Sequence, residues 1–499
     1  MLGTRFTIWT NLYISPQFGI ITLLFINNLL KSIIELNKIM AKKSVSSRKL
    51  WKLGATEYNT QYFDFNKDGD LVVKEGNNIY NTRYLAGKMG TSLEILFPFI
   101  IEERLEDLLD LVSVLSKKTK YKGKFFYHYP MKVNQSKEVV MSLVGEGAHL
   151  ETSSYNELWL IKKMLDQESF NPNIRILCSG PKTDKYINLI DDLQHRGIKI
   201  FPLIEGPNEL KFLQHSKYTV GIRLDMPVKA DSRWNKPIDR FGFSAKEILD
   251  MGSFKNLKIL HYHIGSQIEK FADVLGPIKY ALDVFFKLKE KNPSLETLDI
   301  GGGMPIPYTR RRSYSIEKLM EKILTLIKKE SDKRGMPHPN LVCEWGRYIV
   351  APAQITIYKI IDTKKVLNKK ADANKWYVID GSFMNDLLDT WAIDQKWAVV
   401  PLNNKNDDDL EYVWLAGSSC DSDDIYTGVN NYMMLPDYDA NQGGDPMYIA
   451  FLDTGAYQDP LATHHCMLSS PLKIIAENGH IVVARKRETP EDVGKNFGW

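Results

Sequence analysis

The residues best suited to chemistry lie where apolar runs end. Lys132 closes an aromatic run that begins at Phe125, and Glu344 directly follows the run 341–343. A lysine amine that is shielded from water can attack a carbonyl and hold a cofactor as a Schiff base. A carboxylate can keep a pyridinium nitrogen protonated, which makes the ring an electron sink. The plain alternatives are a lysine that extends to solvent and an ion pair between Glu344 and Arg347.

Three consecutive glycines, Gly301, Gly302 and Gly303, follow the apolar run 297–300. Backbone amides without side chains can approach a phosphate closely, although such a run is also typical of a simple turn. Arg347 is able to hold a phosphate through two parallel hydrogen bonds. These residues therefore indicate a phosphate site.

His261 and His263 are two residues apart in an expected strand, so their side chains face the same way. This spacing suits a metal centre, as in barrel hydrolases, or an aromatic cover over a cofactor ring. A metal centre needs further ligands, and no other expected strand ends in histidine. We expect His263 to cover a ring, His261 to lie in the core, and the run 464–466 (His-His-Cys) to be a loop.

The run 420–424 (Cys-Asp-Ser-Asp-Asp) follows a Gly-Ser-Ser turn. Its plain interpretation is a solvated acidic turn. Its functional interpretation is a cation-binding pair of carboxylates, Asp421 and Asp423, beside the thiol of Cys420. Two carboxylates suit a guanidinium better than an ammonium, because the planar guanidinium offers five donors.

These groups need a scaffold that brings strand ends together. Eight apolar runs alternate with helical patterns, which is typical of an α/β (β/α)8 TIM barrel with its site at the strand ends. The expected strands are 124–133, 149–152, 174–179, 199–204, 218–224, 257–264, 297–300 and 341–343. Helices are expected at 97–118, 155–165, 244–251, 272–289 and 315–330. The strand ends carry Lys132, Glu151, Gly180, Glu205, Arg223, His263, Gly301 and Glu344.

After Trp345 the pattern changes to strands separated by Asn, Asp and Gly turns. It predicts a mostly antiparallel β domain with strands at 355–361, 376–379, 412–415, 447–451 and 480–484. Residues 64–70 resemble a calcium loop, but no helical pattern flanks them, so we expect strand, turn and strand. The expected domains are an N-terminal extension (1–55), an N-terminal contribution to the β domain (56–90), the barrel (91–349) and the C-terminal β domain (350–499).

Composition excludes several classes of partner and site. The 499 residues carry a net charge of +4 without a basic, aromatic-rich stripe, so nucleic acid is not an expected partner. The four cysteines lie far apart and form no C-x-x-C motif. This disfavours a zinc cluster or a disulfide framework and suits the reducing cytoplasm.

The first 39 residues need a separate interpretation. Residues 6–30 contain no charged residue, although several Asn and Gln side chains interrupt the apolar pattern. We expect translation to begin at Met40, with an anchor helix and a docked extension as the alternatives. Membrane contact is expected only if this segment is an anchor.

Taken together, the motifs resemble the fold type III pyridoxal-phosphate decarboxylases of basic amino acids, the group of ornithine, diaminopimelate and arginine decarboxylases. The resemblance extends from residue 56 to the C-terminus. It implies an alanine racemase-like barrel with a β domain, and pyridoxal 5'-phosphate as the cofactor. The matching runs are Tyr-Pro-Met-Lys ending at Lys132, His-Ile-Gly-Ser ending at Ser266, Asp-Ile-Gly-Gly-Gly ending at Gly303, Glu-Trp-Gly-Arg ending at Arg347, and Gly-Ala-Tyr-Gln around Tyr457.

The resemblance also implies residue roles. Lys132 anchors the cofactor, His263 stacks on its ring, and Glu344 pairs with its ring nitrogen. Glu151 and Glu157 are expected near the lysine. The implied cofactor-binding set is Lys132, Glu151, Arg223, His263, Ser266, Gly301, Gly302, Gly303, Glu344, Gly346, Arg347 and Tyr457, and the implied catalytic set is Lys132, His263, Glu344 and Cys420, with no metal.

The pair Cys420-Asp421 is similar to a pair that the partner subunit contributes in this family, which implies a homodimer with shared active sites. In this interpretation Cys420 protonates the substrate Cα, while Asp421 and Asp423 bind a guanidinium. The run 420–423 and the run 129–135 resemble those of arginine decarboxylases most. The implied reaction is decarboxylation of L-arginine to agmatine and CO2, a step of polyamine biosynthesis.

Two features depart from the arginine enzymes. Trp345 replaces the usual proline or serine, and the long insertions of the larger bacterial enzymes are missing. Ornithine, lysine or diaminopimelate therefore remain alternative substrates. A non-catalytic regulatory homologue and a metal-dependent barrel hydrolase built around His261 and His263 are the alternatives outside this activity.

Overall fold

The structure is a computed structural model that describes residues 47–499 except 168–172, 228–239, 310 and 404–408. The expectations for residues 1–39 lie outside this part. Among the described helices, none combines the length and the hydropathy needed to cross a membrane.

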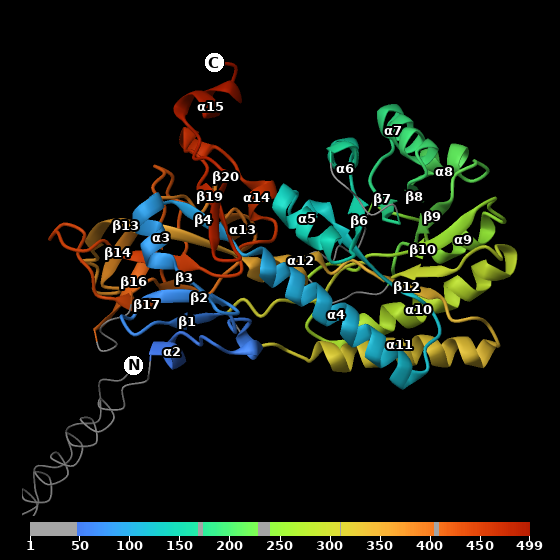
Figure 1. Cartoon of the computed structure of the whole chain (residues 1–499), viewed down its shortest axis with the longest axis horizontal. Coiled ribbons are helices and arrows are strands. Elements are labelled where there is room, and N and C mark those ends of the chain that lie inside the picture. Colours follow the sequence, from blue (N-terminus) through green and yellow to red (C-terminus); the bar gives the residue numbers. More distant parts are fainter. Residues whose placement is uncertain (1–46, 168–172, 228–239, 310, 404–408) are drawn as a thin grey trace, which may run out of the picture.

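The middle of the chain forms the expected barrel, in which eight parallel strands close into a ring (Figure 1). Strand β12 pairs with β5 to close it, with Leu341 opposite Phe125. The barrel predicted from the alternating apolar runs is thereby confirmed. The strands are β5 (Phe125–Pro130), β6 (His149–Thr152), β7 (Arg175–Cys178), β8 (Lys199–Ile204), β9 (Val220–Arg223), β10 (Leu257–His261), β11 (Thr297–Asp299) and β12 (Asn340–Cys343).

Helices surround the barrel and bury one apolar face each. Helix α11 shows how the sequence sets their limits, because the Ser315 side chain caps its first turn and Gly335 ends it at φ +62°. The helices are α4 (Pro98–Thr119), α5 (Lys137–Gly145), α6 (Tyr155–Gln167), α7 (Asp184–His195), α8 (Pro207–Leu213), α9 (Ala245–Asp250), α10 (Phe271–Lys291), α11 (Ile316–Arg334) and α12 (Gly346–Val350).

The C-terminal third builds a nine-stranded sheet that is mostly antiparallel. Its main path runs in the order β17-β16-β14-β13-β4-β19-β20, and β18 pairs with both β13 and β15. The strands are β4 (Leu93–Leu96), β13 (Gln354–Lys365), β14 (Lys375–Ile379), β15 (Val399–Pro401), β16 (Leu410–Ala416), β17 (Met433–Pro436), β18 (Tyr448–Phe451), β19 (Leu472–Glu477) and β20 (His480–Arg485). Short helices follow in its loops: α13 (Asp389–Ile393), α14 (Gln458–Leu461) and α15 (Pro490–Lys495).

The N-terminal strands form a three-stranded sheet of their own, made of β1 (Phe63–Phe65), β2 (Leu71–Glu75) and β3 (Asn78–Asn81). The turn 66–70 joins β1 to β2, as expected. This sheet meets the larger one where the amide of Leu71 donates to the carbonyl of Leu402. The strand that enters the large sheet is β4, which the sequence placed with the barrel. It lies between β13 and β19 and pairs with both of them. All four of its residues are buried, as in an inner strand of a sheet.

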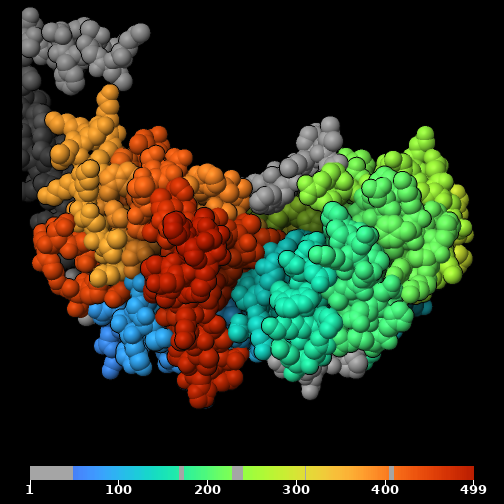
Figure 2. All heavy atoms as spheres, turned by 90° about the horizontal axis from the view of Figure 1, so that it is seen from above, coloured from blue at the N-terminus to red at the C-terminus, as the bar shows by residue number. Residues whose placement is uncertain are grey.

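The barrel and the β domain lie side by side as two lobes (Figure 2). The lobes meet at the carboxyl ends of the barrel strands. There the amide of Tyr457, from the β domain, donates to the carbonyl of Val133, 2.7 Å away. Asn134 also donates to the carbonyl of Gly455 at 2.9 Å. The β domain is thereby attached to the short helical turn that carries Lys132.

Candidate active site

Lys132 lies in the 3-10 turn η2 (Met131–Val133), directly after β5. Its Nζ is 3.4 Å from Oε2 of Glu151, a buried residue at the end of the neighbouring strand. Burial opposes the charged amine, but the carboxylates of Glu151 and Glu344 outweigh it and raise the pKa of Lys132. The Lys132 side chain is 40% exposed, so the ammonium is both held and accessible.

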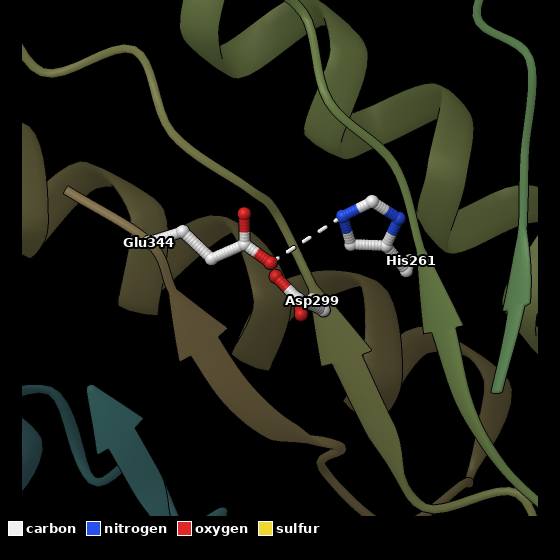
Figure 3. Close-up of side chains that lie close together, drawn as sticks. All are labelled: His261, Asp299 and Glu344. Atoms are coloured by element: carbon white, nitrogen blue, oxygen red, sulfur yellow. Dashed lines mark ion pairs between the residues drawn. The ribbon is translucent and has the colours of Figure 1, made fainter. Parts of the chain in front are cut away.

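Glu344 lies in a buried cluster with His261 and Asp299 (Figure 3). The Oε1 atom of Glu344 is 3.4 Å from Nε2 of His261 and has no hydrogen-bond partner among the described residues. Burial opposes ionisation of Glu344, but His261 and Lys132 outweigh it and lower its pKa. Burial and the charge of Glu344 raise the pKa of Asp299. The surroundings therefore favour ionisation of Glu344 over ionisation of Asp299.

His263 follows strand β10 and turns toward the glycine loop. Its Nδ1 accepts a hydrogen bond from the amide of Gly265 at 3.1 Å. Burial and the charge of Lys132 lower the pKa of His263 to about 3, so the ring is neutral at physiological pH. A neutral imidazole at this position suits a face that packs on another aromatic ring.

The glycine loop lies beside His263 without side chains of its own. A Cβ on Gly302 would come within 3.0 Å of His263 Nε2, and one on Gly301 within 2.5 Å of the carbonyl of Tyr262. The Gly301 amide donates to Asp299 at 2.9 Å. In the described chain, the amides of Gly302 and Gly303 have no acceptor, so they remain available to an anion.

Arg347 supplies the positive charge on this side of the site. Its Nε donates to Ser266 Oγ at 3.1 Å, and its Nη1 donates to Tyr308 Oη at 2.8 Å. The guanidinium also lies 4.4 Å from the centre of the Tyr457 ring. Arg347 and Tyr308 border a cavity of about 460 Å³ between the barrel loops and the β-domain loop 393–396. The basic residues that line it are Lys270, Arg311, Arg312, Arg347 and Lys396, against the acidic Glu269 and Asp394.

Two residues beside the lysine turn have contacts that the sequence did not indicate. Gly346 packs closely on the turn of Lys132, because a Cβ there would lie 2.8 Å from Val133 Cγ2. Glu157 accepts hydrogen bonds from Gln135 and from the amide of Ser153, so it fixes the loops beside the lysine rather than contacting it.

Arg223, at the end of β9, donates to Glu205 Oε1 at 2.7 Å. Glu205 in turn lies 3.5 Å from the buried ammonium of Lys182. Arg223, Glu205 and Lys182 therefore form a row of alternating charges near the ends of neighbouring strands.

Cys420, Asp421 and Asp423 lie in the β-domain loop after β16, apart from the barrel residues. In the described chain their hydrogen bonds and ion pairs all stay within the β domain. Asp421 pairs with His465 at 3.2 Å, and Cys420 lies beside Cys466. Asp424 is buried and accepts from the amides of Phe383 and Ser419, so it holds the loop. Among the described residues, no hydrogen bond or ion pair joins this loop to Lys132.

The residues fit pyridoxal phosphate. The unpartnered Oε1 of Glu344 is a buried acceptor for a protonated ring nitrogen, and buried groups of this kind are rare without a partner. The space at Gly302 admits a ring or phosphate that a side chain would block. Arg347, Ser266 and the free glycine amides supply donors for a phosphate dianion.

Sequence reasoning missed three residues of this site. His261 was assigned to the core, yet it faces Glu344; Asp299 was noted only as part of the glycine motif; and Tyr308 was not noticed. The first two had a detectable signal, because they occupy the last positions of adjacent strands and face each other in register. Tyr308 lies in an irregular loop, where no periodicity indicates the direction of a side chain.

Two family models match the chain. Residues 110–351 match the pyridoxal binding domain of the pyridoxal-dependent decarboxylases, and residues 251–455 match their C-terminal sheet domain. This chain is a pyridoxal-dependent decarboxylase family member. The family explains why the lysine, the glutamate and the glycine loop lie at one end of the barrel, and it identifies pyridoxal phosphate as the cofactor.

Several relatives of this decarboxylase have names that specify arginine. The biosynthetic arginine decarboxylase of Phocaeicola vulgatus is 28% identical over 345 residues, which cover 62% of this chain and 54% of that protein. The one from Neisseria meningitidis serogroup B is 22% identical over 581 residues, which cover 89% and 90% of the two chains. The chain thus spans about half the length of the first of these relatives.

Solved structures share the fold of this decarboxylase. The biosynthetic arginine decarboxylase from Campylobacter jejuni superposes with a TM-score of 0.73 at 18% identity, covering 89% of this chain and 92% of that one. The diaminopimelate decarboxylase from M. jannaschii gives a TM-score of 0.72 at 22% identity, covering 87% and 97%. These similarities establish the architecture of a barrel with an attached sheet domain.

Proposed function

We propose that this decarboxylase converts L-arginine to agmatine and CO2 in the cytoplasm, as a step of polyamine biosynthesis. The observation that carries the decarboxylase activity is the combination of an accessible ammonium, Lys132, with a buried carboxylate, Glu344, whose Oε1 lies 3.4 Å from His261 Nε2 but makes no hydrogen bond among the described residues. The names of the relatives and two carboxylates of the loop 420–424, the half-buried Asp421 and the exposed Asp423, support arginine as the substrate.

Bound pyridoxal phosphate supplies an electron sink for the carbanion that remains when CO2 leaves. Glu344 holds the proton at the ring nitrogen, because its pKa is low and its Oε1 makes no hydrogen bond among the described residues. Lys132 presents its amine at the mouth of the barrel, where Glu151 orients it. His263 covers the ring as a neutral imidazole, and Arg347 binds the phosphate.

The substrate side requires residues that make no hydrogen bond or ion pair with Lys132 among the described residues of one chain. We propose that a second copy of the chain supplies Cys420, Asp421 and Asp423, in a homodimer with shared sites. Cys420 then delivers the proton to the substrate Cα. Asp421 and Asp423 bind the guanidinium, which matches two carboxylates through its planar fork of donors.

The first experiment offers arginine, ornithine, lysine and diaminopimelate to the purified holoenzyme and traps the released CO2. Release from arginine at a rate far above the others supports the proposal. Release from another amino acid keeps the activity and refutes the substrate. Lys132→Ala is expected to abolish both turnover and the visible absorbance of the lysine-bound cofactor.

Mixing two inactive variants tests the shared site. Lys132→Ala and Cys420→Ala remove groups that the proposal assigns to different subunits of one site. A mixed dimer carries one site with both residues intact, so mixing is expected to restore up to about a quarter of the wild-type activity. No recovery after subunit exchange, verified by native mass spectrometry, contradicts the shared arrangement.

The structure contains one group of side chains that could serve the alternative function, a metal-dependent hydrolase. His261, Asp299 and Glu344 place one ligand atom each within 4.8 Å of one another, although His263 is not part of this group. The raised pKa of Asp299 disfavours it as a metal ligand, because metals bind the ionised carboxylate. Metal analysis of active enzyme distinguishes the two functions, since the proposed reaction requires no bound metal.

A further inference from the structure

Cys420 and Cys466 are neighbours although 46 residues separate them in the chain. Their Sγ atoms lie 3.7 Å apart, and both residues are exposed. The next pair of residues, Asp421 and His465, forms an ion pair with 3.2 Å between Oδ2 and Nε2. Two loops are therefore joined at two adjacent points. The other two cysteines, Cys178 and Cys343, are buried.

Both loops are fixed to the same short segment of the β domain. Asp424 of the first loop accepts from the amide of Phe383 at 2.8 Å. Asn385 binds the second loop, accepting from the amide of His465 at 2.9 Å and donating to its carbonyl at 3.0 Å. The relative position of the two thiols is thus set by buried anchors. A disulfide needs its sulfur atoms at about 2.05 Å, so side-chain rotation has to close the gap that remains.

We propose that Cys420 and Cys466 form a reversible intrachain disulfide, which makes this pair a redox modification site. The oxidant is a peroxide. One thiolate attacks the peroxide and becomes a sulfenic acid with release of water, and the second sulfur then displaces the hydroxyl as a further water. Two thiols and one hydrogen peroxide thereby give one disulfide and two waters. In reducing compartments such disulfides are typically transient and redox-sensing.

The consequence for activity rests on the proposed function, in which Cys420 protonates the substrate. A sulfur held in a disulfide has no proton to deliver. Oxidation is therefore expected to lower decarboxylation at least tenfold, and a dithiol reductant is expected to restore it. Because Lys132 and Glu344 lie elsewhere, the cofactor absorbance is expected to stay unchanged.

The test treats the reduced holoenzyme with hydrogen peroxide at low molar excess and maps its peptides without reduction. A cross-linked peptide pair that contains Cys420 and Cys466, and that separates after dithiothreitol, supports the proposal. Cys178 and Cys343 serve as internal controls and are expected to remain thiols. Free or separately oxidised Cys420 and Cys466 after complete loss of activity overturn it.

Cys466→Ser provides the matched variant, because it leaves Cys420 in place. Its initial activity is expected to equal that of the wild type, while activity lost to peroxide no longer returns fully with dithiothreitol. Equal recovery in the variant and the wild type contradicts the pairing. The cross-link is read by mass, independently of turnover. A reduced protein that releases no CO2 from any substrate refutes the proposed function, whereas a missing cross-link refutes this inference.

Discussion

Glu344 and His261 face each other inside the barrel with 3.4 Å between Oε1 and Nε2, and both side chains are only 2% exposed. Asp299, whose pKa is raised by burial and by the charge of Glu344, completes the cluster. This arrangement keeps one carboxylate ionised in a buried place where it would otherwise take up a proton. In the proposed function, this negative charge pairs with the protonated ring nitrogen of the cofactor.

The first prediction concerns this charge. Glu344→Gln keeps the shape of the side chain but cannot hold a proton at the ring nitrogen. We expect kcat to fall about a hundredfold or more, as for other groups that hold a proton in catalysis. Cofactor binding, measured by absorbance, is expected to persist because Lys132 and Arg347 remain.

Asp299→Asn is the control for that variant. The raised pKa of Asp299 favours its neutral form, so an amide is expected to replace it with little change in charge while still accepting from the Gly301 amide. We expect kcat within about tenfold of the wild type. A loss as large as that of Glu344→Gln contradicts the assignment of the neutral and the ionised carboxyl group.

The second prediction concerns the glycine loop. Gly301 has φ +61°, and a Cβ there would lie 2.5 Å from the carbonyl of Tyr262. Gly335 has nearly the same φ of +62° but nothing within 4 Å of its Cβ. Both alanine variants pay about 1–2 kcal/mol for the left-handed backbone. Only Gly301→Ala adds a steric clash, so urea unfolding is expected to show the larger destabilisation for Gly301→Ala.

The third prediction concerns the buried ion network between the domains. Lys473 is 3% exposed and contacts both Glu94 and Asp459, and Asp459 also accepts from Asn134 beside the lysine turn. Lys473→Met removes the ammonium but leaves both acids buried. We expect the free energy of unfolding to fall by about 2 kcal/mol, less than for an isolated buried pair, because Arg485 still pairs with both Glu94 and Asp459.

Lys74→Met is the surface comparison for Lys473→Met. Lys74 pairs with Asp64 at 2.7 Å, but the Lys74 side chain is 49% exposed. Solvent screens such a pair, so its loss is expected to cost less than about 1 kcal/mol in the same urea experiment. If both variants lost similar free energy of unfolding, the buried network would not stabilise the fold more than a surface ion pair does.

The fourth prediction concerns pH. Burial raises the pKa of Asp453 to about 7, although hydrogen bonding by Asn59 partly opposes it. The folded protein keeps this proton up to neutral pH, whereas the unfolded chain loses it near pH 4. The folded state therefore binds more protons between about pH 4 and 7, and its stability falls as the pH rises through that window.

Asp453→Asn cannot titrate and still accepts from Asn59. In urea unfolding, we compare the free energy of unfolding of the variant with that of the wild type. We expect this difference to favour the variant by on the order of 2–4 kcal/mol more at pH 8 than at pH 5. An identical pH dependence in both proteins would show that Asp453 is ionised in the folded state.

The sequence by itself determined the barrel, because alternating apolar runs and helical patterns have few other compact solutions. It also placed Lys132, Glu344 and the glycine loop at strand ends, and parallel strands bring such ends together. The succession of apolar runs and helical patterns along the chain was sufficient to predict these features.

Tertiary structure decided the contacts between segments that are distant in sequence. Alternation indicates the buried face of a strand but not its neighbours, so it did not show that β4 joins the large sheet or that β1–β3 form a sheet of their own. The roles of Asp299 and His261 follow from strand register in the closed barrel. Cys420 and Cys466 meet because Phe383 and Asn385 anchor both of their loops, and no periodicity in the sequence encodes such an anchor.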